Sequence, residues 1–226
     1  MNANCIIHLY YCTQLIIYYQ QIFIKMIPGP DFYYKCPKCG NVLSKGSLFS
    51  GNTFGAKFYS DGKRIVPMLP SFPVIAKCNV CDTILWLNEA NEIKKAETNK
   101  IQKADFLTIY EYLLVIDSKN YSSISDEIFI RQRILWGFND RIRKGDTLFN
   151  GGTDKKLWKE NNLRLIELLD SDNINQTFLI IELYRNLGEF DMCRIILESI
   201  ANEKHKWLKD TFNKEIEKKN TLVFRI

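Results

Sequence analysis

Two cysteine pairs with the same spacing constrain this chain more than any other feature. Cys36-Pro-Lys-Cys39 is followed, after 38 residues, by Cys78-Asn-Val-Cys81. A C-x2-C pair places two sulfurs on one tight turn, and two such turns can supply the four thiolates of a tetrahedral metal site. Gly40 suits the first turn because glycine tolerates the backbone angles that such turns require. We therefore predict a metal site formed by Cys36, Cys39, Cys78 and Cys81.

Other uses of paired cysteines fit the sequence less well. A redox site is typically a single pair beside a βαβ pattern, and a disulfide framework accompanies a secretory signal; neither context is found here. Iron stays an alternative because four-sulfur sites suit both zinc and iron. The stretch CPKCG resembles a rubredoxin turn, whereas CNVCD lacks the glycine after its second cysteine. We predict one structural Zn2+, with iron or no metal as the alternatives.

The predicted site is closed rather than catalytic. His8 and His205 are the only histidines, and neither is near a cysteine pair in the sequence. A catalytic zinc site keeps one position open for water or substrate, whereas four protein ligands fill the coordination sphere. Lys35, Lys38 and Lys77 flank the cysteines and would offset the negative charge of four thiolates around a dication. Ordinary solvated surface is the alternative for these lysines.

Residues 27–92 are predicted to form short strands around the cysteine pairs. The runs DFYYKC, FPVIAKC and TILWL are apolar or aromatic and are bounded by turn residues, and Asp61-Gly62 between two apolar runs indicates a hairpin. Strands that lead into two cysteine turns resemble a zinc ribbon over about residues 30–88. Zinc ribbons bind nucleic acid, bind protein or stabilise a fold, so this resemblance leaves the function open.

From about residue 93 the pattern changes to that of helices. Glycine and proline become rare, and apolar residues recur at helical spacing. One predicted helix begins after Ser123 or Ser125, either of which is a plausible N-cap. It ends before Gly145, a plausible C-terminal stop. The pattern predicts about six helices over residues 93–226, and hence an α+β chain with an all-α second part.

Residues 177–200 resemble a tetratricopeptide helix pair. The matching positions are Tyr184, Gly188, Phe190, Cys193, Leu197 and Ile200. The resemblance implies a tight inter-helix turn at Gly188 and a small buried residue at Cys193. Thr177 stands where the family usually has tryptophan, and no second copy of a repeat of roughly 34 residues is evident. An ordinary helical bundle is therefore the alternative.

The same resemblance implies a partner-binding side on the first helix of the pair. Ile180, Ile181 and Tyr184 would face the second helix. The opposite side, which lines the binding groove in that family, would present Asn175, Leu179, Glu182, Arg185 and Asn186. Most of these residues are three or four positions apart, so one ligand could contact them together. The Arg185 guanidinium could bind a carboxylate in bidentate fashion. Solvated polar surface is the alternative.

The sequence contains no nucleotide-binding, serine-hydrolase or zinc-protease motif, and its two histidines leave little for acid–base catalysis. The net charge of +5 is spread along the chain and shows no clustered basic footprint. We predict a non-enzymatic, cytoplasmic, Zn2+-stabilised adaptor that binds another protein through its helical region. Nucleic-acid binding through the ribbon face, where Trp86 and the tyrosines could stack on bases, is the alternative.

Residues 1–26 differ from the rest of the chain. They contain no acidic residue, they are rich in Ile and Tyr, and His8, Gln14 and Gln20 interrupt the apolar run. We predict a mis-assigned start, with translation beginning at Met26. A native apolar helix or membrane anchor, or a signal, is the alternative, so membrane association depends on whether residues 1–25 are translated. The predicted organisation is thus a doubtful leader at 1–26, a zinc ribbon at 27–92 and a helical region at 93–226.

Overall fold

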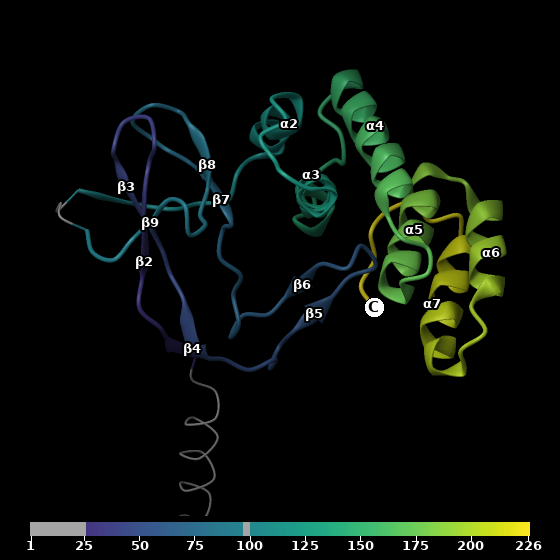
Figure 1. The fold of residues 1–226 in the computed structure, drawn as a ribbon. Coiled ribbons are helices and arrows are strands. Elements are labelled where there is room, and N and C mark those ends of the chain that lie inside the picture. The colour runs from purple at the N-terminus through teal and green to yellow at the C-terminus, as the bar shows by residue number, and fades with distance from the viewer. Residues whose placement is uncertain (1–25, 97–99) are drawn as a thin grey trace, which may run out of the picture. The chain divides into compact units, whose positions relative to one another are not determined.

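The computed structural model describes residues 26–96 and 100–226 (Figure 1). These residues divide into two compact units. The first, which we call the cysteine unit, comprises residues 26–56 and 65–106, and the second, the helical unit, comprises residues 57–64 and 107–226. Most strands lie in the first unit, and the six α-helices of the described chain lie in the second. The predicted α+β composition and helix number are therefore confirmed.

Residues 1–25, which hold the predicted leader up to the expected start at Met26, lie outside the described part of the chain. Among the helices that the structure describes, none is both long enough and apolar enough to cross a membrane.

The cysteine unit contains two hairpins whose turns hold the cysteine pairs. β2 (Phe32–Lys35) and β3 (Val42–Lys45) are antiparallel and flank the first pair, and β7 (Ile75–Lys77) and β8 (Ile84–Trp86) flank the second in the same way. Side chains alternate along β2, so that Tyr34 is buried while Lys35 is exposed. The core of the unit joins both hairpins through Tyr34, Leu43, Ala76, Leu85 and Leu87, together with two of the cysteines.

Two further strands enlarge the first hairpin into a four-stranded sheet. β9 (Glu92–Ile93) pairs with β2, and β10 (Ile101–Lys103) pairs in parallel with β3, which gives the order β10-β3-β2-β9. β1 (Ile27–Pro28) pairs separately with β4 (Leu48–Ser50). The cysteine unit therefore ends at 106 and not at the predicted boundary of 92, because β10 belongs to its sheet.

The predicted hairpin at Asp61-Gly62 is present, but it belongs to the helical unit. β5 (Lys57–Phe58) and β6 (Arg64–Ile65) pair, and Gly62 at the tip has a φ of +76°, which glycine adopts without strain. By their contacts, residues 57–64 group with the helical unit, whereas the sequence pattern predicts them within the ribbon. The hairpin tip makes its buried hydrogen bonds with helices and with the end of the chain, as described below.

The helices pack in chain order, each against the next (Figure 1). Their bounds are α2 (Ile109–Asp117), α3 (Ile124–Arg143), α4 (Gly152–Leu168), α5 (Ile174–Leu187), α6 (Phe190–Ser199) and α7 (Lys206–Glu217), with a 3-10 turn η1 (Glu203–His205) before the last. Ser123 caps α3 as predicted, in a capping box with Asp126, and Gly145 follows that helix with a φ of +85°.

The helix pair predicted at residues 177–200 is observed as α5 and α6. Gly188 ends α5 in the left-handed conformation, with a φ of 84°, so the chain turns directly into α6. Cys193 is fully buried where the two helices pack against each other, which is the place predicted for a small residue. Unlike a helix with one buried stripe, α5 is buried on nearly every side. It packs against α6 and α7 through one core cluster and against α3 and α4 through another.

Candidate metal centre

The two cysteine turns have the same hydrogen-bond pattern. In the first, the Cys36 N–H donates to the Asn41 carbonyl at 2.8 Å, and the Gly40 N–H donates back to the Cys36 carbonyl at 2.9 Å. In the second, the Cys78 N–H donates to the Thr83 carbonyl, and the Asp82 N–H donates to the Cys78 carbonyl, both at 2.9 Å. Matched turns aim their two sulfurs in matched directions, so the pairs can share one ion.

Gly40 and Asp82 occupy equivalent positions and share a left-handed backbone, with φ values of 75° and 57°. The second turn has Asp82 where the first turn has Gly40. Aspartate can also adopt this conformation, since it is among the residues enriched at positive φ. The Asp82 carboxylate also lies 3.2 Å from the Lys77 ammonium, which makes one of the predicted flanking lysines an ion-pair partner.

The four sulfurs predicted as ligands come together, all within 4.8 Å of one another. The Cys36 and Cys81 sulfurs are 3.6 Å apart, as are those of Cys39 and Cys78. Tetrahedral zinc with Zn–S bonds of about 2.3 Å requires sulfur–sulfur distances of about 3.8 Å, whereas a disulfide requires about 2.05 Å. All four cysteines are free thiols, and their spacing fits one shared ion and excludes a disulfide.

Polar side chains outside the ligand set hold the turns in register. The Gln102 carboxamide donates to the Lys77 carbonyl at 2.7 Å and accepts from the Asn79 N–H at 2.9 Å and from Asn41 Nδ2 at 3.1 Å. Asn41 Nδ2 also lies 3.6 Å from the Cys78 sulfur. Gln102 therefore links the first turn to the second, a connection that reasoning from the sequence missed because β10 is remote from both pairs.

Hydrogen bonds and burial divide the thiols into those that ionise readily and those that do not. The hydroxyl and N–H of Thr83 lower the pKa of Cys81 to about 6. Burial opposes ionisation of Cys78, but the N–H groups of Val80 and Cys81 still lower the pKa of that thiol. The Asn41 N–H favours the Cys39 thiolate, yet desolvation and the neighbouring sulfurs together raise the pKa of Cys39 to about 12. Four thiolates thus require a cation to offset their charge.

Replacing Gln102 by alanine should weaken metal binding without removing a ligand. Outer-shell partners of metal sites typically change affinity by about 10–100-fold, and we expect a loss in that range when zinc binding is measured by competition with a chromophoric chelator. Lys103→Ala, on the same strand, is the matched control and should bind zinc like the wild type. An unchanged affinity in Gln102→Ala would show that the turns hold their register without this carboxamide.

The five residues predicted to line a partner groove do not form one surface. Glu182 and Arg185 have no exposed side-chain area and form an ion pair with each other at 2.7 Å. Ser60 donates to Glu182 at 2.8 Å, and Arg185 donates to the carbonyls of Asn220 and Leu222. The prediction that these two side chains are available to a partner is wrong, because they bind the hairpin tip and the C-terminal segment.

The other three predicted residues lie at two separate pockets of the helical unit. Exposed Asn175 and buried Leu179 line a cavity of about 530 Å³ beside the β5–β6 hairpin, which we call the hairpin pocket. Asn186 lines a cavity of about 630 Å³ beside α4, which we call the α4 pocket. The predicted groove is thus divided by the buried Glu182–Arg185 pair.

No protein-family model matches the chain, and searches of curated proteins and of solved structures found no significant match. Among the residues that the structure describes, the cysteine tetrad is the one group of three or more Cys, His, Asp or Glu side chains arranged to hold a metal ion. The assignment of a metal centre therefore rests on the geometry of the four sulfurs.

Proposed function

We propose that this chain is a non-enzymatic, zinc-stabilised adaptor. In this proposal the cysteine unit is a zinc ribbon whose single Zn2+ is held by Cys36, Cys39, Cys78 and Cys81, and the tetratricopeptide-like helical unit binds another protein. The observation that carries the metal assignment is the meeting of four sulfurs within 4.8 Å on two turns with the same hydrogen bonds.

The donor set favours a structural role for the ion. Four thiolates complete the coordination of zinc and leave no position for a water or a substrate. Cys36 and Cys78 are buried in the core of the cysteine unit, so the ion would join the two hairpins from within. Cysteines that bind a metal ion and form no disulfide suit a reducing compartment such as the cytoplasm.

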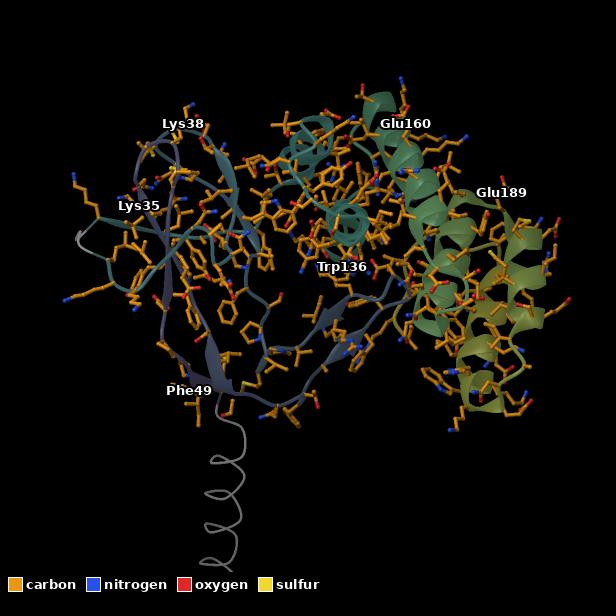
Figure 2. The ribbon with its side chains drawn as sticks, in the orientation of Figure 1. Lys35, Lys38, Phe49, Trp136, Glu160 and Glu189 are labelled. Carbon is orange, nitrogen blue, oxygen red and sulfur yellow. The ribbon has the colours of Figure 1, made fainter. Side chains whose placement is uncertain are left out.

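The lysines near the centre supply countercharge at the surface. Lys35 and Lys38 project from the cysteine unit (Figure 2), and Lys77 pairs with Asp82. A four-thiolate zinc site has a net charge of −2, which the positive charges of Lys35 and Lys38 would partly offset, whereas the charge of Lys77 is already paired with Asp82. The same lysines are the ground for the alternative, nucleic-acid binding at this face.

The surface of the helical unit supports protein binding at the hairpin pocket. Trp207 is 60% exposed and Phe58 is 43% exposed, and both line this pocket together with Asn175 and Leu179. Tryptophan and phenylalanine are enriched at protein interfaces, and exposed aromatic side chains gathered at a concave site are typical of binding surfaces.

A capture experiment tests the adaptor role. Tagged wild-type chain should retain a protein from its native extract after nuclease treatment. Trp207→Ala should reduce the retained amount several-fold, because Trp207 is the most exposed of the aromatic side chains named at this pocket and tryptophan is enriched among the residues that dominate binding energy. Ile195→Ala is the matched control, since Ile195 is 61% exposed on α6 and lines none of the described pockets.

The salt dependence of capture separates the two candidate functions. An apolar protein interface should retain its partner between about 50 and 200 mM salt, whereas phosphate binding weakens steeply over that range. Capture that disappears with nuclease and falls steeply with salt would contradict the adaptor role and favour nucleic-acid binding at the cysteine unit.

A further inference from the structure

One end of the cysteine unit exposes a group of large apolar side chains. We call it the apolar end and define it as residues 26–30, 46–56 and 65–73. Phe49 and Phe54 are 75% and 70% exposed, and Ile27 and Leu69 are 51% and 47% exposed. Figure 2 shows Phe49 and Lys38, a residue of the first cysteine turn, at opposite ends of this unit. The apolar end is therefore remote from the metal centre.

Three segments of the chain are held together at this end. β1 pairs with β4, with Ile27 opposite Ser50, the residue that follows Phe49. The third segment lies against the end of β4, since a Cβ atom added at Gly51 would lie 2.8 Å from Leu69 Cδ1. Exposed apolar side chains from all three segments are thus neighbours, and contiguous groups of this kind mark contacts with proteins or with membranes.

The apolar end contains no charged residue, although 25% of the residues in the whole chain are charged. Its polar side chains are serine, threonine and asparagine only, and some of them are engaged within the end itself. Ser47 Oγ donates to the Pro30 carbonyl at 2.6 Å, and Asn52 Oδ1 accepts from the Phe54 N–H at 2.9 Å.

This composition distinguishes between the two kinds of contact. Protein interfaces surround an apolar centre with a polar rim and form about one hydrogen bond per 100–200 Å². The apolar end has no charged group for such a rim. The boundary region of a lipid bilayer takes up apolar and aromatic side chains without requiring specific hydrogen bonds from them, so it fits this end better.

The sequence that leads into this end has the same character. Residues 1–25 directly precede β1 in the chain and contain one charged residue, Lys25, and no acidic residue. Tyrosine is frequent among them, and it is enriched at membrane–water interfaces. A chain that starts at Met26 keeps the apolar end complete, whereas a chain that starts at Met1 adds a further apolar stretch immediately before it.

We propose that the apolar end of the cysteine unit binds the surface of a lipid bilayer. Phe49, Phe54 and Leu69 enter the boundary between head groups and acyl chains, and their burial there drives the association. Because the end has no lysine or arginine, neutral phosphatidylcholine is sufficient for binding. This contact goes beyond the adaptor role, since it uses the other unit and brings a partner held by the helical unit to a membrane.

A photo-crosslinking group at position 49 tests what meets this end. Phe49→p-benzoyl-Phe is made in the full chain, purified without chelators, mixed with phosphatidylcholine vesicles and irradiated. We expect a covalent adduct with the lipid, detected by mass spectrometry. Leu114→p-benzoyl-Phe is the matched control, because Leu114 is 57% exposed on α2 in the helical unit, and it should give little lipid adduct.

Vesicle flotation of the full chain measures how much the exposed rings contribute. Phe49→Ser with Phe54→Ser should lower the partition coefficient onto phosphatidylcholine vesicles by about tenfold or more, because the burial of two phenylalanines is lost. Both side chains are largely exposed, so this variant should stay folded and keep its metal. Leu114→Ser with Ile195→Ser removes two exposed apolar side chains from the helical unit, and it should partition like the wild type.

Three results would overturn the inference. An adduct of position 49 with a second copy of the chain, in place of lipid, would make the apolar end a self-association surface. A lipid adduct no stronger than that of the Leu114 control would show only random contact. Unchanged partitioning of Phe49→Ser with Phe54→Ser would show that the rings do not enter the bilayer. Protein capture that persists in this variant would leave the adaptor role intact even if the lipid contact failed.

Discussion

The wild-type chain, purified without chelators, is expected to contain one zinc ion, and Cys78→Ser is expected to contain almost none and to lose the fold of the cysteine unit. Structural zinc contributes on the order of 10 kcal/mol or more to the folding of small units. The core of the cysteine unit is small, and two of its buried members are the ligands Cys36 and Cys78. Removing one thiolate therefore removes both a ligand and the link between the two hairpins.

The helical unit should survive this change. Its hairpin is held by its own hydrogen bonds, from Ser60 to Glu182 and from Asn139 to Asp61, and none of them involves the metal centre. We expect amide resonances of the cysteine unit to collapse toward random-coil positions while those of residues 107–226 keep their dispersion. Cys193→Ala is the matched control, because Cys193 is a buried cysteine outside the tetrad and its variant should keep the zinc.

Elemental analysis and two-dimensional NMR spectra decide this prediction. Detection of iron in place of zinc would contradict the assignment of zinc, and iron bound by thiolates would also give a visible absorption band. A Cys78→Ser chain whose cysteine unit stays folded without metal would show that the strands alone are sufficient.

Replacing Asp61 by alanine should destabilise the helical unit by about 1–3 kcal/mol, because the change leaves Nη2 of buried Arg143 and Nδ2 of buried Asn139 without their acceptor, while Nη1 of Arg143 keeps its pair with Asp140. Asp61 is fully buried at the hairpin tip, where it pairs with Arg143 and accepts from Asn139 at 2.8 Å. Its own carbonyl accepts from the Trp136 indole at 2.9 Å. Urea unfolding, followed by the helical circular dichroism signal, measures the loss.

Two further variants separate the buried charge from other effects. Adding Arg143→Met to Asp61→Ala should recover much of the stability, since an apolar replacement of both partners of a buried ion pair is often neutral. Glu160→Ala removes the exposed pair with Lys156 and should cost less than about 1 kcal/mol. A loss of stability in Asp61→Ala as small as that of Glu160→Ala would contradict the role assigned to the buried pair.

The hairpin lies in the chain between Cys39 and Cys78, so its release also lengthens the loop that the metal closes. Each doubling of a flexible loop costs only about 0.6 kcal/mol, which is small beside the binding free energy of structural zinc. Asp61→Ala should therefore still retain one zinc ion.

Local patterns predicted the local features correctly. The two C-x2-C pairs were brought together as expected, because each pair is already arranged by its own turn. Asp61-Gly62 and Gly188 form the predicted turns, since the backbone conformation at glycine depends mainly on neighbouring residues. The cap at Ser123 was equally predictable, because its side chain bonds an N–H only three residues away.

The partner groove was predicted from helical periodicity, and that reasoning failed where packing comes from several directions. A polar side of a helix usually faces solvent, but α5 has helices on both sides and the C-terminal segment over its Glu182–Arg185 side. Ser60, which binds Glu182, is 122 positions away in the sequence. No pattern of steps of three and four residues contains such a contact.

By itself, the sequence determined the two cysteine pairs that supply the four candidate ligands, the hairpin turn and the succession of helices, because each pair, turn and helix depends on residues within a few positions of one another. Only the tertiary structure decided that Gln102 joins the cysteine turns, that Glu182 and Arg185 are buried, and that the hairpin belongs to the helical unit. The physical reason is shared: a buried polar group must find its partner wherever the folded chain provides one, and these partners come from distant parts of the sequence.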